Sequence, residues 1–150
     1  LIPSTHIRRQ SPIQNDVPVP FHQDSSVMNL LNVEILNFWF PLDVAGRDRP
    51  TVELIPIAQS SILPFGMNSD PHRLYSHLEI GLPTLKEYLG DYETWSPVIH
   101  PGDVLIIQSK NIHRTQLNAP KPRMDFELRF CRTQHISKRI DIKTQNIHLN

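Results

Sequence analysis

Along this chain of 150 residues, apolar and polar positions form short runs that are interrupted every few residues by prolines or turn residues. This pattern predicts short strands. The clearest case is residues 123–132, RMDFELRFCR, which alternate strictly. Met124 and Phe126 lie on one face of this expected strand, and Arg123 and Asp125 lie on the other. Such a strand can line a polar cavity with its charged face and pack its apolar face on a core.

Five further segments have the β-branched and aromatic content of strands, and prolines or turn residues separate them. They are residues 15–21, 30–42, 51–58, 104–108 and 112–117. The prolines inside the first of these make it an extended segment or an edge strand, because proline cannot donate to a sheet ladder. Residues 82–90, LPTLKEYLG, have helical spacing and end in a glycine, so they predict a helix. The rest of 59–97 predicts an irregular insertion of the kind that often carries function.

The composition agrees with a fold made mainly of short strands. The chain has 14 prolines and only 5 glycines. Prolines at this density leave little room for long helices. We therefore expect an all-β fold with a few short helices. The length suits one core, so residues 1–150 are interpreted as a single domain.

The charge and the cysteine content narrow the classes of function. Fifteen basic and fifteen acidic residues give a formal net charge of zero, so the chain lacks the basic footprint of a nucleic-acid-binding protein. No apolar run approaches the length of a membrane span, and there is no signal-peptide core at the start. The single cysteine, Cys131, excludes an intrachain disulfide. We expect a cytoplasmic protein that acts on a small molecule.

The stretch PFHQDSS, residues 20–26, contains the first candidate chemistry. On an extended chain residues i and i+2 point to the same side, so His22 and Asp24 can converge on one metal ion while Gln23 points elsewhere. In a chain with eight histidines the His-x-Asp pattern alone fits a simple turn equally well.

A third ligand has to come from another part of the chain, and His113 is the best candidate. It follows a Pro-Gly-Asp turn and the apolar strand 104–108, and an arginine opens the next strand. Two imidazoles and one carboxylate leave three coordination positions open, as in mononuclear non-haem Fe(II) centres that activate oxygen. The order of these features is more specific than any one of them.

The segments FHQD, NFWFPLD, IHPGDVLIIQSKNIHRT and RMDFELRF resemble the phytanoyl-CoA dioxygenase family of Fe(II)/2-oxoglutarate oxygenases, over about residues 15–131. The resemblance implies a double-stranded β-helix, a jelly-roll barrel of the cupin type. It implies Fe(II) held by His22, Asp24 and His113, with 2-oxoglutarate as co-substrate. O2 would then oxidise a small-molecule substrate, with release of succinate and CO2.

The resemblance also assigns residues to the co-substrate. Arg123 matches the position that pairs with the distal carboxylate of 2-oxoglutarate, and a guanidinium fork suits that group. Trp39 matches a residue that lines the co-substrate pocket. Asn37, two positions earlier on the same strand face, is a candidate for a hydrogen bond to co-substrate or substrate.

One departure from the family leaves two candidates for the arginine that binds the distal carboxylate, called the anchor below. The family often has a hydroxyl residue two positions after the arginine, whereas this chain has Asp125, which would repel a carboxylate unless it turns away or forms a salt bridge. Arg129, on the same strand face, is therefore a rival anchor. Arg129 and Gln23 are also possible substrate contacts.

Two other departures from the family pattern leave alternative functions open. The helical N-terminal part that is usual in the family is missing, and residues 59–97 match no substrate motif. A metal-dependent cupin that needs no 2-oxoglutarate, acting as a dioxygenase or isomerase, is one alternative, and a non-catalytic degenerate barrel is another. Related halogenases replace the ligand carboxylate with a small residue, so Asp24 favours hydroxylation or another oxidation.

Overall fold

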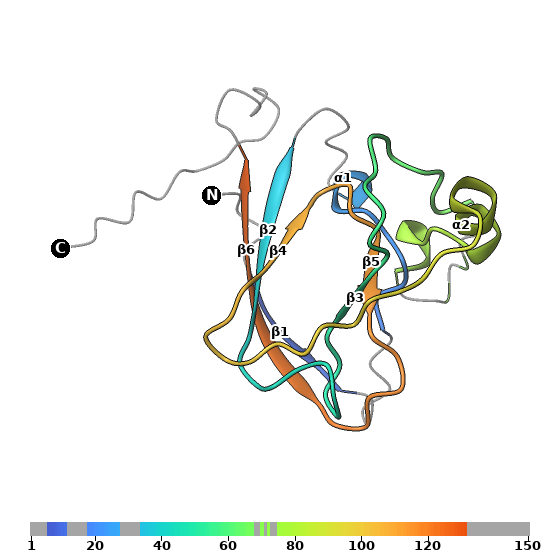
Figure 1. Cartoon of the computed structure of the whole chain (residues 1–150). Helices are drawn as coiled ribbons and strands as arrows, with labels where there is room; N and C mark the ends of the chain where they lie inside the picture. Colours follow the sequence, from blue (N-terminus) through green and yellow to red (C-terminus); the bar gives the residue numbers. More distant parts are fainter. Residues whose placement is uncertain are drawn as a thin grey trace.

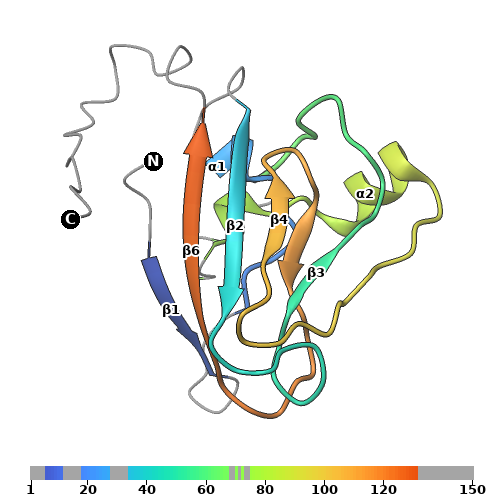
Figure 2. The same ribbon diagram turned by 60° about the vertical axis from the view of Figure 1, so that its left-hand side comes forward.

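Two antiparallel sheets face each other in this protein (Figure 1). The structure, a computed structural model, describes residues 6–11, 18–27, 34–67, 70, 72 and 75–131. The larger sheet contains, in spatial order, β1 (His6–Gln10), β6 (Arg123–Cys131), β2 (Ile35–Pro41) and β4 (Leu105–Gln108) (Figure 2). The smaller sheet pairs β3 (Val52–Leu54) with β5 (His113–Thr115).

The helical elements are short and lie outside the larger sheet. They are α1 (Asp24–Val27), the 3-10 helix η2 (Ser76–Leu78) and α2 (Leu82–Leu89). The prediction of a mainly β, cupin-type fold with a few short helices is confirmed. None of the helices in the described residues has the length and apolar character needed to cross a membrane.

The strands are shorter than their sequence patterns predict. The segment 51–58 contributes only Val52–Leu54, because Pro56 has no amide donor and Ile55 donates instead to Ile112 O at 3.0 Å. The prediction for residues 30–42 is confirmed from Ile35 to Pro41, and residues 28–33 lie outside the described residues.

Residues 15–21 were predicted as an extended segment or an edge strand, and the described residues 18–21 are not part of a regular strand. Residues 12–17 lie outside the described residues, and 18–21 form no ladder because Pro18 and Pro20 cannot donate. This segment still runs beside β5, since Thr115 N donates to Val19 O at 3.0 Å. The helix prediction is confirmed: α2 ends at Leu89, and Gly90 follows with a φ of 69°.

The two faces of β6 have different surroundings. Arg123, Asp125 and Glu127 are buried on the inner face, with 3%, 0% and 6% of their surface exposed. Met124 and Phe130, on the opposite face, are 42% and 39% exposed. The charged face thus lines the interior as predicted, whereas the apolar face does not pack on a core of described residues.

Two clusters of buried apolar side chains position the elements. One lies between the two sheets and consists of Trp39, Ala45, Val52, Leu54, Ile99 and Ile107. The other lies on the α2 side of the smaller sheet and consists of Phe21, Ile55, Leu63, Ile80, Leu85 and Ile112. Phe21 and Ile112 directly precede His22 and His113, so this second cluster fixes the backbone of both histidines.

Candidate metal centre

The backbone places His22 and His113 side by side. They form an antiparallel β-bridge in which His22 N donates to His113 O at 3.0 Å and His113 N donates to His22 O at 3.1 Å. Residues directly opposite each other in such a pair project to the same face. The centroids of the two rings are accordingly 4.3 Å apart.

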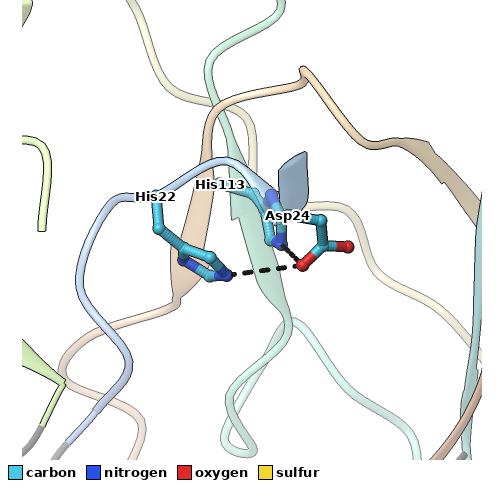
Figure 3. A group of neighbouring side chains, drawn as sticks. All are labelled: His22, Asp24 and His113. Carbon is cyan, nitrogen blue, oxygen red and sulfur yellow. Dashed lines mark ion pairs between the residues drawn. The ribbon is translucent and has the colours of Figure 1, made fainter. Parts of the chain in front are cut away.

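Asp24 joins the histidines by a different route from the one expected. It is the first residue of α1, so the extended backbone ends at His22 and the argument from i, i+2 geometry is wrong. The turn into α1 is held by Ser25 N, which donates to Ser109 O at 2.9 Å. Asp24 Oδ1 lies 3.7 Å from His22 Nε2 and 3.9 Å from His113 Nε2 (Figure 3).

Both imidazoles are oriented by backbone carbonyls. His22 Nδ1 lies 2.8 Å from Pro20 O, and His113 Nδ1 lies 3.0 Å from Asn111 O. A carbonyl only accepts hydrogen bonds, so in the neutral form of each ring Nδ1 carries the proton and Nε2 has the free lone pair. Metal-ligating histidines are commonly fixed in this way through their other ring nitrogen.

The protonation states suit a metal site. Burial, and then the neighbouring His113, lowers the pKa of His22 to about 3, so its ring is neutral at neutral pH. Burial by itself raises the pKa of the Asp24 carboxyl, but His113 and Arg129 outweigh burial and leave that pKa below its ordinary value. A neutral imidazole and an ionised carboxylate are the forms that bind a divalent ion.

The donor set therefore fits Fe(II). One ligand atom from each of His22, Asp24 and His113 lies within 4.8 Å of the others, and all three residues are buried. Two imidazole nitrogens and one carboxylate oxygen match the facial triad of non-haem iron. A cavity of about 200 Å³, lined by these residues, opens onto the cluster and leaves room for further ligands.

Two polar residues, Asn37 and Arg129, lie against the outer oxygen of Asp24, and Glu127 accepts hydrogen bonds from both of them. Asn37 Nδ2 donates to Asp24 Oδ2 at 3.3 Å and to Glu127 Oε2 at 3.4 Å. Arg129 Nε lies 3.7 Å from Asp24 Oδ2, and its Nη2 donates to Glu127 Oε2 at 2.6 Å. Oδ2 is thus engaged, and Oδ1 faces the histidines. Arg129, the rival anchor, lies beside Asp24.

Arg123 lies in another part of the cavity wall and is also buried. Its Nε donates to Asp125 Oδ2 at 2.7 Å, and its Nη1 donates to Pro50 O at 2.8 Å. Its guanidinium carbon lies 5.0 Å from the centroid of the Trp39 ring. Of the two possibilities left open for Asp125, the structure therefore shows the salt bridge.

This ion pair is costly. Burial lowers the pKa of Arg123 and raises the pKa of Asp125, despite their mutual attraction. Both shifts disfavour the charged forms, so desolvation exceeds the attraction within the pair. Trp39 Nε1, which is buried, has no hydrogen-bond partner among the described residues. Trp39 and Arg123 both line the cavity.

Gln23 does not line the cavity, which argues against the predicted substrate contact. Its Nε2 donates to Ser61 O at 3.0 Å and to Lys110 O at 2.8 Å, and its Oε1 accepts from Leu63 N at 2.8 Å. The side chain thus fastens the turn before α1 to two other segments and is fully buried.

Several cavity residues were missed by the sequence reasoning. Thr115, two residues after His113 on the same strand face, could have been found from the period of β5. Arg8 belongs to a strand of five residues, which is too short for a clear alternation. Tyr75 comes from the irregular insertion, where no pattern predicts direction.

No protein-family model matches the sequence, and no curated protein sequence is significantly similar to it. Among solved structures, EvdO2 from Micromonospora carbonacea var. aurantiaca is similar, with a TM-score of 0.63 and 20% identity. The same protein complexed with 2-oxoglutarate gives a TM-score of 0.64, also at 20% identity. Each match covers 85% of this chain and 50% of the EvdO2 chain.

EvdMO1 is similar as well, with a TM-score of 0.57 and 20% identity, over 89% of this chain and 27% of its own. This chain thus spans about half the length of EvdO2 and about a quarter of the length of EvdMO1. At this level of identity the likeness is one of fold. The chain has the cupin-type β-sandwich fold that it shares with a protein whose structure holds 2-oxoglutarate.

Proposed function

We propose that this protein is an Fe(II)/2-oxoglutarate-dependent oxygenase that hydroxylates, or otherwise oxidises, a small-molecule substrate. Succinate and CO2 would be released from the co-substrate. The observation that carries the proposal is that one ligand atom from each of His22, Asp24 and His113 lies within 4.8 Å of the others, with both Nδ1 atoms held by carbonyls. The 2-oxoglutarate-bound EvdO2 structure supports the choice of co-substrate.

Bound Fe(II) would supply the oxygen activation and hydrogen abstraction that protein side chains cannot perform. The protein's own contribution is the placement of ligands. His22 and His113 each offer Nε2, because Nδ1 faces a carbonyl, and Asp24 offers one oxygen because Asn37 and Arg129 engage the other. Fixing a ligand through such outer contacts limits rearrangement of the site.

Arg123 and Trp39 are proposed to bind the co-substrate. Arg123 Nη2 has no hydrogen-bond partner among the described residues, and Trp39 Nε1 is an unsatisfied donor in the same wall. A carboxylate that accepts from both would satisfy them, and charge-assisted bonds of this kind are the strong ones. The apolar side chains of Val52 and Ile107 line the same cavity.

Substrate-dependent succinate formation tests the proposal. Protein supplied with Fe(II), 2-oxoglutarate and O2 should convert a candidate substrate with one succinate formed for each product. Asp24→Ala and Arg123→Ala should each reduce the rate by about a hundredfold or more. His100→Ala, at an exposed histidine, is the matched control and should retain the native rate. Succinate formation that is equal with and without Fe(II) would refute the proposal.

One observation favours the alternative of a metal cupin that needs no 2-oxoglutarate. Arg123 already forms an ion pair with Asp125, so it has a carboxylate partner even when no 2-oxoglutarate is bound. In that case substrate oxidation would require Asp24 but would continue without 2-oxoglutarate and in the Arg123→Ala variant. The same assay with 2-oxoglutarate omitted separates the two functions.

A further inference from the structure

The charges in the cavity wall are not evenly paired. Four arginines line the cavity: Arg8, Arg114, Arg123 and Arg129. Three of them form close ion pairs, which are Arg114–Glu53 at 2.7 Å, Arg123–Asp125 at 2.7 Å and Arg129–Glu127 at 2.6 Å. Among the described residues, Arg8 makes no hydrogen bond and no ion pair. It is therefore a cavity cation that a ligand can use.

The strand register places Arg8 beside the proposed co-substrate anchor. β1 lies beside β6 at the edge of the larger sheet (Figure 2), and in this pair Arg8 is directly opposite Asp125, and Gln10 is opposite Arg123. Side chains opposite each other in an antiparallel pair share a face, so Arg8 projects to the charged inner face of β6. Arg9 is opposite Met124 on the outer face and is exposed.

The charge of Arg8 acts on the same group of residues. Burial raises the pKa of Asp125 and lowers that of Arg123; the charge of Arg8 partly opposes the first shift and adds to the second, after larger contributions from burial and from the neighbouring charges. These effects place the Arg8 guanidinium within electrostatic range of both side chains. Its interaction with Arg123 is a repulsion between like charges, which an anion bound between the two would relieve.

The balance of charge shows what such an anion would need. Arg123 and Asp125 together carry no net charge, so a carboxylate that arrived beside this pair would bring an uncompensated negative charge into a buried place. An unpaired buried charge is strongly unfavourable. A further positive charge on the same face removes this difficulty, and Arg8 provides it.

We infer that Arg8 is a second cationic contact for the distal carboxylate of 2-oxoglutarate, alongside Arg123. This inference rests on the proposed function. Asp125 then holds the Arg123 guanidinium in place, while Arg8 compensates the charge of the incoming carboxylate. The consequence is a preference for a 2-oxo acid with a second carboxylate over one without it, and Arg8 is a source of that preference.

Calorimetric titration of the Mn(II)-loaded protein tests this inference without turnover. The two probes are 2-oxoglutarate and 2-oxopentanoate, which has the same carbon chain but lacks the distal carboxylate. Arg8→Ala should weaken 2-oxoglutarate binding by about tenfold and leave 2-oxopentanoate binding unchanged. Arg9→Ala removes the same charge from the outer face of the same strand and should change neither affinity.

The outcomes are distinguishable. Equal 2-oxoglutarate affinity in native protein and Arg8→Ala overturns the inference, and so does an equal loss for both probes, which would indicate a structural role. Failure of the native protein to bind 2-oxoglutarate refutes the proposed function itself. If Arg8→Ala does not fold, Arg8→Gln keeps a long polar side chain without the charge, and the same selective loss is expected.

Discussion

At the scale of single residues, the site depends on small polar contacts that orient its ligands. The order of the motifs predicted that His22, Asp24 and His113 would meet, and they do so, although the argument from i, i+2 spacing was wrong because Asp24 begins a helix. The sequence could not show that Asp24 begins a helix, or that Pro20 O and Asn111 O set the two imidazole tautomers. Those contacts are made by backbone atoms, whose direction no residue type encodes.

The ion pair of Asp125 with Arg123 leads to a prediction about affinity. Asp125→Asn removes a negative charge beside the proposed carboxylate site but keeps an oxygen that can accept from Arg123 Nε. We expect 2-oxoglutarate to bind about tenfold more tightly, because like-charge repulsion is removed. Calorimetry on the Mn(II)-loaded variant measures this.

The matched control is Asp48→Asn, which removes a carboxylate from the exposed ion pair with Lys121. It should leave the affinity at its native value. Weaker 2-oxoglutarate binding in Asp125→Asn would show that the full charge of Asp125 is required to orient Arg123, contrary to this account.

The buried His22 ring predicts a pH dependence of stability in the metal-free protein. The pKa of His22 is about 3 in the folded chain, against an ordinary value of 6.5, so between these values the unfolded chain binds a proton that the folded chain does not. The free energy of unfolding should therefore fall as the pH drops from 6.5 towards 3. Urea unfolding in the presence of a chelator measures this fall.

His22→Gln should flatten that part of the curve, whereas His100→Gln, at an exposed histidine, should leave the native slope. Parallel curves for native protein and His22→Gln would show that the buried ring does not resist protonation as described.

At the scale of elements, the strength of each pattern decided what could be predicted. The alternation over nine residues of β6 and the apolar spacing of α2 gave both elements correctly. The pairing of residues 18–22 with β5 was not predictable. The prolines in this segment remove the sequence pattern of a strand, and the pairing consists only of isolated hydrogen bonds with Thr115 and His113. Yet this pairing is what brings the two histidines together.

The packing of α2 should matter for metal binding although the helix is remote from the ligands. Leu85 is fully buried in the cluster that contains Phe21 and Ile112, the residues directly before the two histidines. Leu85→Ala should cost about 2–5 kcal/mol of stability through the cavity it leaves. It should also weaken Mn(II) binding, since both ligand-bearing segments lose support.

Leu82→Ala provides the comparison on the same helix. Leu82 is 62% exposed, so this substitution should change stability by less than about 0.5 kcal/mol. Denaturant unfolding and Mn(II) titration of both variants test the point. Equal effects of the two substitutions would mean that α2 does not support the site through this cluster.

At the scale of the whole molecule, two sheets enclose a charged cavity, and the larger sheet turns an apolar face outward. Exposed apolar side chains on that outer face include Ile7, Leu36, Ile106, Met124 and Phe130. The proline-punctuated pattern of short strands predicted a mainly β fold, and the resemblance of the motifs to a known family implied its cupin type, which the structure confirms. That residues 1–150 form a single domain stays a prediction.

The central claim is that His22, Asp24 and His113 bind one Fe(II) that also binds 2-oxoglutarate. Its most direct test is an anaerobic titration of the metal-free protein with Fe(II) and then 2-oxoglutarate, followed through the visible metal-to-ligand charge-transfer band. The account predicts a band that saturates at equimolar Fe(II) in the native protein and in His100→Ala. The band should be lost or strongly weakened in Asp24→Ala and His113→Ala. A native protein that binds Fe(II) without developing the band, or a band of native strength in both ligand variants, would contradict the account.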